Sequence, residues 1–410
     1  MALVFPFSAL RPVSKAANAV AAVPYDVVST DEAKKLVESN TLNFLHVSRA
    51  EIDLPPGTNP YSKAVYQTAA DNFEQLKRTA PLIKEEHDSL YFYRLKEGSH
   101  EQTGLAGCYS LDDYDKNLIR KHERTRRDKE DDRTRHILAL RAQTGIALLV
   151  YRESKEINAV KMRTCQSKPL LDVVAADGVQ HTIWRLDAED ESKAIAAFHD
   201  VPMLYIGDGH HRIASAARVR DELVSSVSEG ADTQAHFFLG VAFPDTEVRI
   251  LAYNRAVSDL AGHTTRSFLE AVSAKFSVRA DADPLPTSGQ VSMYLAGTWY
   301  AVDLEANQGS VSYVEPSARL DVSLLQDQLL APLLRVEDVR TDPRIVFIGG
   351  SRGIVTLEAL VNSGEAAVAF SLAPVEVQQL LAVSDAGDIM PPKSTWFEPK
   401  LRDGLLIHVI

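Results

Sequence analysis

Apolar and polar positions along the chain alternate between two periods, and this predicts a mixture of helices and strands. Helical spacing of apolar residues recurs at 61–78, 191–198, 268–276, 321–334, 355–363 and 375–383. Short apolar or alternating runs predict strands at 42–47, 89–94, 104–110, 147–151, 181–186, 345–348 and 367–372. We therefore predict an α+β fold, in which both classes of element occur along the whole chain.

Neighbouring strands are predicted to pair in two places. The runs 236–243 and 248–253 flank Pro244 and Asp245, which favours an antiparallel pair. The run 292–303 has Gly297 near its middle and predicts a hairpin.

Residues 111–143 have a different pattern. Between Ile119 and Ile137 every side chain is charged or polar, and the stretch holds good helix formers and no proline. The pattern predicts a long charged helical insert, in which pairs such as Glu123 and Arg127 are spaced for ion pairing. A solvated helix and a functional one remain equally compatible with this pattern.

Composition limits the class of protein. The chain has 410 residues, 45% of them hydrophobic and 24% charged, which is typical of globular proteins with two or three domains. We place a boundary near residue 258 and predict domains at 1–258 and 259–410. The net charge of -12 disfavours a general nucleic-acid binder. The two cysteines show no metal spacing, and neither a signal peptide nor a membrane span is evident, so we expect a cytoplasmic protein.

The clearest candidate for chemistry is the stretch Met203-Leu-Tyr-Ile-Gly-Asp-Gly-His-His-Arg212. An apolar run, two glycines and a following helical pattern predict a strand, a tight turn and a helix. The turn would place Gly209, His210, His211 and Arg212 at the amino end of the helix, where backbone N–H groups and the helix dipole favour an anion. A tight structural junction with surface histidines is the alternative.

Two further polar clusters contain candidate residues. Lys121-His-Glu-Arg-Thr125 lacks the second histidine of a His-Glu-x-x-His zinc helix, but Glu123 could act as a base, and Lys121 and Arg124 could bind phosphate. Near the end, Lys393, Ser394 and Thr395 stand in a proline-rich segment. Pro392 precedes the lysine where a phosphate-binding loop needs glycine, so such a loop is not expected. A structural tail that packs Trp396 and Phe397 is the alternative.

These motifs together resemble a known family. Pro24-Tyr-Asp-Val, Asn43-Phe-Leu-His-Val, Lys121-His-Glu-Arg-Thr, Asp208-Gly-His-His-Arg and Met390-Pro-Pro-Lys-Ser-Thr-Trp-Phe-Glu-Pro-Lys400 are similar to motifs of the bacterial and archaeal family catalogued as domain of unknown function 1015. The Asp-Gly-His-His-Arg motif also resembles the signature of the ParB and sulfiredoxin superfamily, which includes kinases of free L-serine. The resemblance implies a ParB/sulfiredoxin-like amino-terminal domain that holds nucleotide phosphates at Gly209, His210, His211 and Arg212.

We accordingly expect an ATP- or ADP-dependent small-molecule kinase that uses Mg²⁺, with L-serine as a candidate acceptor. Glu123, Asp208 and Lys121 are the expected catalytic residues. Gly209, His210, His211, Arg212, Arg124, Lys393, Ser394 and Thr395 are the expected nucleotide-binding residues. A nucleotide-binding regulatory or scaffold protein is the first alternative, and a metal-dependent hydrolase is the second.

Overall fold

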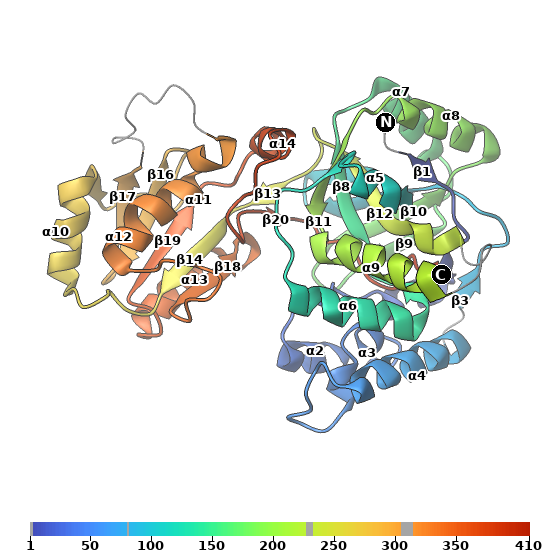
Figure 1. Ribbon diagram of the computed structural model, residues 1–410, viewed down its shortest axis with the longest axis horizontal. Coiled ribbons are helices and arrows are strands. Elements are labelled where there is room, and N and C mark those ends of the chain that lie inside the picture. The colour runs from blue at the N-terminus through green and yellow to red at the C-terminus, as the bar shows by residue number, and fades with distance from the viewer. Residues whose placement is uncertain (1–2, 80–81, 227–232, 305–314) are drawn as a thin grey trace. The chain divides into compact units, whose positions relative to one another are not determined.

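The computed structural model describes residues 3–79, 82–226, 233–304 and 315–410, and these form two compact units. Unit 1 contains the described residues up to Lys121, from Thr125 to Val248, and from Pro399 to Ile410; unit 2 contains residues 122–124 and 249–398. Each unit has helices and a sheet of its own, which confirms the α+β fold (Figure 1). The domain division at residue 258 stays a prediction; the compact units change over at residue 249, and residues 399–410 return to unit 1.

The two longest strands of unit 1, β5 His100–Ser110 and β12 Phe237–Pro244, lie side by side in the middle of its main sheet. The strands of unit 1 are β1 Val4–Phe5, β2 Leu10–Pro12, β3 Leu82–Lys84, β4 Tyr91–Glu97, β5 His100–Ser110, β6 Ile119–Arg120, β7 Ala142–Gln143, β8 Ala147–Tyr151, β9 Leu171–Val174, β10 Gln180–Arg185, β11 Leu204–Asp208, β12 Phe237–Pro244 and β21 His408–Val409. The main sheet has the order β6-β11-β8-β12-β5-β4-β10-β9, and β1 pairs with β5. Within it β6 runs parallel to β11, and β8 runs parallel to β12.

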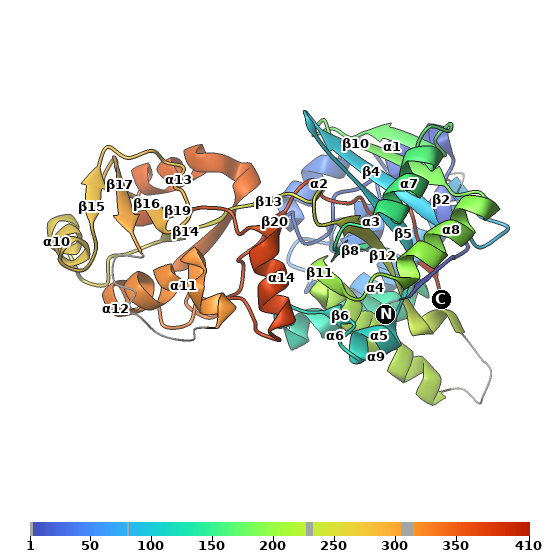
Figure 2. The same cartoon turned by 90° about the horizontal axis from the view of Figure 1, so that it is seen from above.

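Unit 1 also contains helical segments. They are α1 Ser14–Val20, α2 Thr30–Val37, α3 Leu45–Ser48, the 3-10 turn η1 Ala50–Asp53, α4 Lys63–Thr79, α5 Leu111–Asp115, α6 Arg127–Leu140, α7 Lys155–Thr164, α8 Ala188–His199, α9 His210–Ser226 and the 3-10 turn η2 Thr233–His236. Helix α6 lies between α4 and α9, whereas α7 and α8 pack side by side (Figures 1 and 2).

The apolar stripe predicted at 61–78 explains the position of α4. Its buried side chains recur at helical spacing, at Val65, Tyr66, Ala69, Phe73 and Leu76. They join a core that also contains Phe44, Leu140 and Ile407. A second core fills the space between the main sheet and α7, α8 and α9. Residues from distant parts of the sequence thus stabilise unit 1 together.

Unit 2 is built on an antiparallel sheet. Its strands are β13 Ile250–Leu251, β14 Tyr253–Val257, β15 Val278–Ala280, β16 Gln290–Leu295, β17 Thr298–Asp303, β18 Ile345–Gly349, β19 Val368–Leu372 and β20 Trp396–Phe397, and the sheet order is β15-β17-β16-β19-β14-β18. Its helical segments are α10 Thr265–Lys275, η4 Pro316–Arg319, α11 Asp321–Leu325, the π turn η5 Gln326–Leu330, α12 Ala331–Leu334, η6 Gly350–Arg352, α13 Gly353–Asn362 and α14 Val377–Asp385. The predicted hairpin at 292–303 is confirmed as β16 and β17.

Two sequence predictions about local structure are wrong. Residues 42–47 do not form a strand, because Asn43 accepts the backbone N–H of Leu45 and the short helix α3 begins there. The run 111–143 is not one helix: β6 and the non-helical residues 121–126 separate α5 from α6. Nor is α6 wholly solvated, since it buries Asp132, Thr134 and His136.

The predicted pairing of 236–243 with 248–253 is also wrong. Both runs form strands, but β12 pairs with β5 and β8 of unit 1. In unit 2, β13 pairs with β20, and β14 pairs with β18 and β19. The short connection at Pro244 therefore carries the chain out of one sheet instead of closing a hairpin.

Among the described residues, none of the helices is both long and apolar enough to span a membrane.

Candidate functional site

The corner between β11 and α9 in unit 1 has the predicted strand–turn–helix form. The buried strand β11 ends at Asp208, and α9 begins at His210. Gly209 between them has a φ of +96°, a conformation that other residues rarely adopt. A Cβ atom there would lie 3.2 Å from the Cα atom of Ala147 and 3.4 Å from Cδ of Arg212. Glycine is therefore required both by the backbone angle and by the close approach of β8.

Asp208 forms an ion pair that sequence analysis did not predict. Its Oδ2 atom lies 2.9 Å from Nζ of Lys400, in the segment that returns to unit 1. Burial raises the pKa of Asp208, but Lys400 and Arg212 lower it more, so the pKa lies well below the ordinary range of an aspartate. The carboxylate is ionised at neutral pH and is a weak proton acceptor.

Arg212 was expected to bind phosphate, but its guanidinium group contacts the protein itself. Nη1 donates a 2.6 Å hydrogen bond to the carbonyl of Ile146, and Nη2 donates a 3.1 Å hydrogen bond to Oδ1 of Asp26. The side chain also lies near the ring of Tyr25, 5.7 Å from its centroid. These contacts join the first turn of α9 to the Tyr25–Asp26 segment, so Arg212 fixes the position of that segment beside the corner.

The two histidines of the corner differ in exposure. His210 is buried and His211 is half-buried. Nε2 of His211 accepts a 2.9 Å hydrogen bond from the backbone N–H of Arg126, so a neutral His211 carries its proton on Nδ1. Lys121, which follows β6, lies over the ring of Tyr114 with Nζ 3.8 Å from the centroid. Partial burial lowers the pKa of Lys121.

The returning segment 399–410 is anchored along its length in unit 1. Asp403 exchanges two backbone hydrogen bonds with Ala22, of 3.0 and 3.1 Å. Arg402 forms an ion pair with Asp177, and its Nε donates to Nε2 of His181 over 3.2 Å. Burial, and then the charge of Arg402, lower the pKa of His181 to about 3, so this imidazole is neutral.

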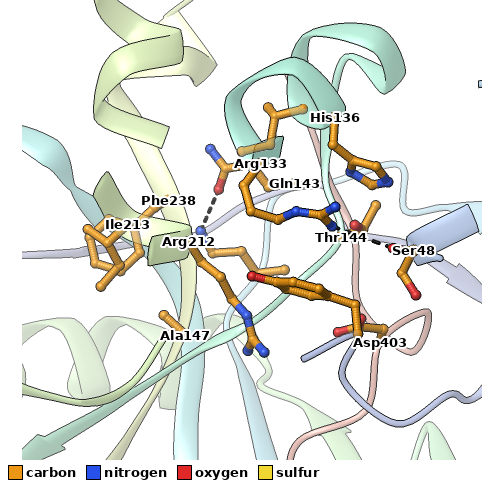
Figure 3. A pocket seen from close by; sticks show the side chains of 14 residues that line it. Ser48, Arg133, His136, Gln143, Thr144, Ala147, Arg212, Ile213, Phe238 and Asp403 are labelled. Carbon is orange, nitrogen blue, oxygen red and sulfur yellow. Dashed lines mark hydrogen bonds between the residues drawn. The ribbon is translucent and has the colours of Figure 1, made fainter. Parts of the chain in front are cut away.

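A small cavity with a mixed polar and apolar lining lies beneath the first turn of α9. It has a volume of about 30 Å³, and Arg212, Arg133 of α6, Ser48 and Asp403 are among the residues that line it (Figure 3). The Arg133 guanidinium stacks on Tyr25, 4.0 Å from the ring centroid, and pairs with Asp132 over 2.8 Å. The cavity therefore places one buried carboxyl group beside two guanidinium groups.

The predicted site residues near the end of the sequence lie in unit 2. Lys393 has a φ of +58°, and its Nζ lies 5.5 Å from the ring centroid of Tyr253. The carbonyl of Lys393 accepts a 3.3 Å hydrogen bond from buried Arg255. Ser394 is buried, and its hydroxyl donates to the carbonyl of Pro391 over 2.6 Å. Thr395 is half-buried and precedes β20.

Glu123 and Arg124 also belong to unit 2, because Met390 donates a 2.8 Å hydrogen bond to the carbonyl of His122. Arg124 is exposed, whereas Glu123 is half-buried. Arg124 lines a groove of about 530 Å³ together with Pro391 and Pro392. The groove's charged lining residues are Arg124, Arg340, Asp327, Glu337, Asp338 and Asp388. Acidic groups outnumber basic ones there, which disfavours a phosphate ligand.

The predicted residues thus fall into two groups. Unit 1 brings together Asp208, Gly209, His210, His211 and Arg212, and it also contains Lys121. Unit 2 contains Glu123, Arg124, Lys393, Ser394 and Thr395. Asp26, Lys400 and Asp403 were not among the predicted site residues. Lys400 stands in a motif that the family resemblance had picked out, but no pattern in the sequence marked Asp403.

A family model described as protein of unknown function (DUF1015) matches residues 4–323. The chain belongs to the DUF1015 family. The match includes the Asp208–Arg212 corner and ends before the Lys393–Thr395 segment. No curated protein matches this DUF1015 chain.

Several solved structures are similar over most of their length. A conserved hypothetical protein from Pyrococcus furiosus is 12% identical, with a TM-score of 0.38, 74% of this chain covered and 95% of the other. SbnI with a C-terminal truncation from Staphylococcus aureus is 10% identical, with a TM-score of 0.39 and coverage of 74% and 87%. A free serine kinase in complex with AMP is 12% identical, with a TM-score of 0.36 and coverage of 73% and 91%.

Proposed function

We propose that this DUF1015 protein binds the phosphates of ATP or ADP at the corner between β11 and α9. We further propose that it transfers a phosphoryl group to the hydroxyl of a small molecule, with L-serine as the first candidate. The observation that carries the proposal is the position of α9, a 17-residue helix whose amino end follows a buried strand through an obligatory glycine.

Helix geometry favours an anion at this corner. The aligned peptide dipoles place partial positive charge at the amino end of α9, and the N–H groups of the first turn point outward there. Lys400 and the partly exposed His211 add donor groups beside it. In the proposal Gly209, His210 and His211 bind phosphate, and Lys121 and Lys400 offset its charge. Phosphoryl transfer depends mainly on such positioning and charge neutralisation.

Asp208 fits a role with Mg²⁺ better than the role of a base. Its carboxylate is ionised and only partly buried, and carboxylate oxygens are ligands that Mg²⁺ accepts. A bound Mg²⁺ would neutralise phosphate charge. The low pKa of Asp208 argues against its accepting a proton from a hydroxyl group.

The part played by the other predicted residues differs between the units. Arg212 donates hydrogen bonds to Asp26 and to the Ile146 carbonyl, and these bonds hold the first turn of α9 in place. Participation of Glu123, Arg124, Lys393, Ser394 and Thr395 stays a prediction from the sequence.

Calorimetry with the full-length protein tests nucleotide binding. ATP and ADP, each with Mg²⁺, should bind, and His211→Ala should weaken binding roughly 10- to 100-fold, as expected for one lost hydrogen bond to a charged group. His199→Ala is the matched control, because His199 is exposed at the end of α8. Equal affinities for wild type and His211→Ala would contradict binding at this corner.

Phosphorus NMR of reactions with ATP tests transfer. A panel of amino acids and small alcohols, beginning with L-serine, should yield a phosphomonoester and ADP. Nucleotide binding without any phosphorylated product would instead favour the regulatory or scaffold function. Absence of nucleotide binding, with a metal retained by the purified protein, would favour the hydrolase.

A further inference from the structure

Three residues that line the cavity beneath α9 each carry a buried polar atom that lacks a hydrogen-bond partner among the described residues. These atoms are Oδ2 of Asp403, Oγ of Ser48 and Nε of Arg212. A buried polar group without a partner destabilises the folded state, so such groups are rare and call for an explanation. The lining thus includes Asp403 with an unpartnered acceptor, Arg212 with an unpartnered donor, and Ser48 with a hydroxyl that can do both (Figure 3).

The size and chemistry of the cavity select its occupant. Its volume of about 30 Å³ has room for a water-sized group but not for a phosphate or a carboxylate. A metal cation is disfavoured by the guanidinium groups of Arg133 and Arg212, and an apolar group would leave all three atoms without partners. An O–H group suits both the acceptor and the donor, because it donates to the Asp403 carboxylate and accepts from the Arg212 guanidinium.

The cavity adjoins the proposed phosphate corner. Arg212 belongs to the first turn of α9, and Ala147, which also lines the cavity, lies against Gly209. Exposure falls inward from the surface: the side chain of Asp26 is 41% exposed, that of Arg212 is 10% exposed, and Asp403 is only 2% exposed. Asp403 is therefore the most deeply buried of these three residues.

We propose that Asp403 is the general base of this protein and that its Oδ2 atom takes the proton of a hydroxyl group seated in the cavity. This role rests on the proposed phosphoryl transfer from ATP. As the hydroxyl oxygen forms a bond to the γ-phosphorus, its O–H bond breaks and the proton passes to Asp403. The bond from the γ-phosphorus to the bridging oxygen breaks, ADP leaves with that electron pair, and Asp403 later returns the proton to solvent. Nε of Arg212 donates to the attacking oxygen and holds it in place.

The electrostatic surroundings of Asp403 suit this task. Burial raises its pKa to about 7, although Arg212 of α9, Arg133 of α6 and the neighbouring Arg402 oppose the rise and Asp26 adds to it. The other titratable groups that line the cavity are Tyr25 and His136. Burial raises the pKa of Tyr25 far above neutrality and lowers that of His136 to about 4, so both are neutral near pH 7. A base with a pKa near the working pH is the most effective one.

The backbone fixes Asp403 independently of its carboxyl group. Asp403 pairs with Ala22 through both backbone groups, and Gly404 next to it has a φ of +86°. A Cβ atom on Gly404 would lie 2.8 Å from the ring of Phe44. Asp403→Asn keeps the shape of the side chain and all of these contacts, so the variant is expected to fold.

The test compares wild type, Asp403→Asn and the control Asp71→Asn, whose aspartate is exposed on α4. Phosphorus NMR is recorded with Mg-ATP alone, where water is the hydroxyl source, and with Mg-ATP plus L-serine. Inorganic phosphate identifies water as the occupant, and a phosphomonoester identifies the acceptor hydroxyl. Asp403→Asn should lower kcat about 10²- to 10⁴-fold with unchanged affinity for ATP, whereas the control should match wild type.

The pH profile separates a base from a structural group. The kcat/KM of wild type should fall about tenfold per pH unit below pH 7, because protonated Asp403 cannot accept a proton, and Asp403→Asn should lack this limb. Turnover of Asp403→Asn equal to that of wild type would overturn the role of Asp403 and leave the kinase proposal standing. A wild type that binds ATP but forms neither product would overturn both.

Discussion

The ion pair between Lys400 and Asp208 gives the most direct test of how the returning segment 399–410 is held. Lys400→Met removes the charge and keeps most of the side-chain volume. Nζ of Lys400 lies 2.9 Å from Oδ2 of Asp208, and 14% of the Lys400 side chain and 32% of the Asp208 side chain are exposed. We expect the substitution to make the segment easier to detach from unit 1.

The magnitude follows from the burial of the pair. Exposed ion pairs contribute up to about 1 kcal/mol, and breaking a fully buried pair costs about 3–5 kcal/mol. The pair of Lys400 and Asp208 lies between these limits, so a loss of about 1.5–3 kcal/mol is expected. Because 1.4 kcal/mol corresponds to a factor of ten, opening of the segment should become roughly 10- to 150-fold more frequent.

Hydrogen exchange measured by mass spectrometry reports this opening. Peptides that cover 399–410 include the backbone amides of Asp403 and Ile407, which donate to Ala22 and Leu10. Their exchange should accelerate by the stated factor in Lys400→Met, while the β16–β17 hairpin of unit 2 should exchange as in wild type. The double variant with Asp208→Asn should show a smaller added loss, because Asp208 then carries no charge to leave unpaired.

Two results would refute this reasoning. Exchange of 399–410 that is unchanged in Lys400→Met would mean that the ion pair does not hold the segment. Equal acceleration in the β16–β17 hairpin would mean that the substitution acts on the whole molecule instead of on one contact.

Three further substitutions probe other features. Gly209→Ala should lower the stability of unit 1 by about 1–3 kcal/mol in urea unfolding, because alanine is strained at a φ of +96° and its Cβ would crowd Ala147; a smaller loss would contradict the tight corner. Asp403→Asn should be more stable than wild type by a few kcal/mol at pH 8. The pKa of the Asp403 carboxyl is about 7 in the folded protein and near 4 in the unfolded chain, so the stability that this carboxyl contributes is present below pH 4 and is lost as the pH rises through 7. That advantage should disappear in melts at pH 4. Ser29→Ala removes the capping box of α2 and should cost about 1 kcal/mol by urea unfolding, whereas Ser192→Ala, at an exposed position of α8, should cost much less.

Most of the helices and strands predicted from local sequence patterns are present, because these patterns depend on neighbouring residues. The stripe of α4 and the turn at Gly297 are examples. The corner at Gly209 was found in the same way. The strand predicted at 42–47 failed because the Asn43 side chain starts a helical turn, and a run of six residues cannot distinguish these outcomes.

Features that join distant residues were not predictable from these patterns. The segment 111–143 is charged, yet Asp132 is buried because Tyr66 and Arg133 bind its carboxylate. The pairing of β12 with β5 and β8 depends on contacts more than 80 positions apart. The importance of Lys400 and Asp403 appears only when 399–410 is seen packed in unit 1. Sequence spacing carries no information about such partners.

Folding during synthesis has to accommodate the return of 399–410 to unit 1. Residues 249–398 emerge from the ribosome as a continuous stretch and can begin to pack. Unit 1 is complete only after the synthesis of β21 and of Lys400 and Asp403, the partners of Asp208 and Ala22. The surface of unit 1 that residues 399–410 cover therefore stays exposed while about 150 residues are translated. Translation proceeds at about 5–20 residues per second. We therefore expect chains cut before residue 399 to leave unit 1 without β21 and without the partner of Asp208.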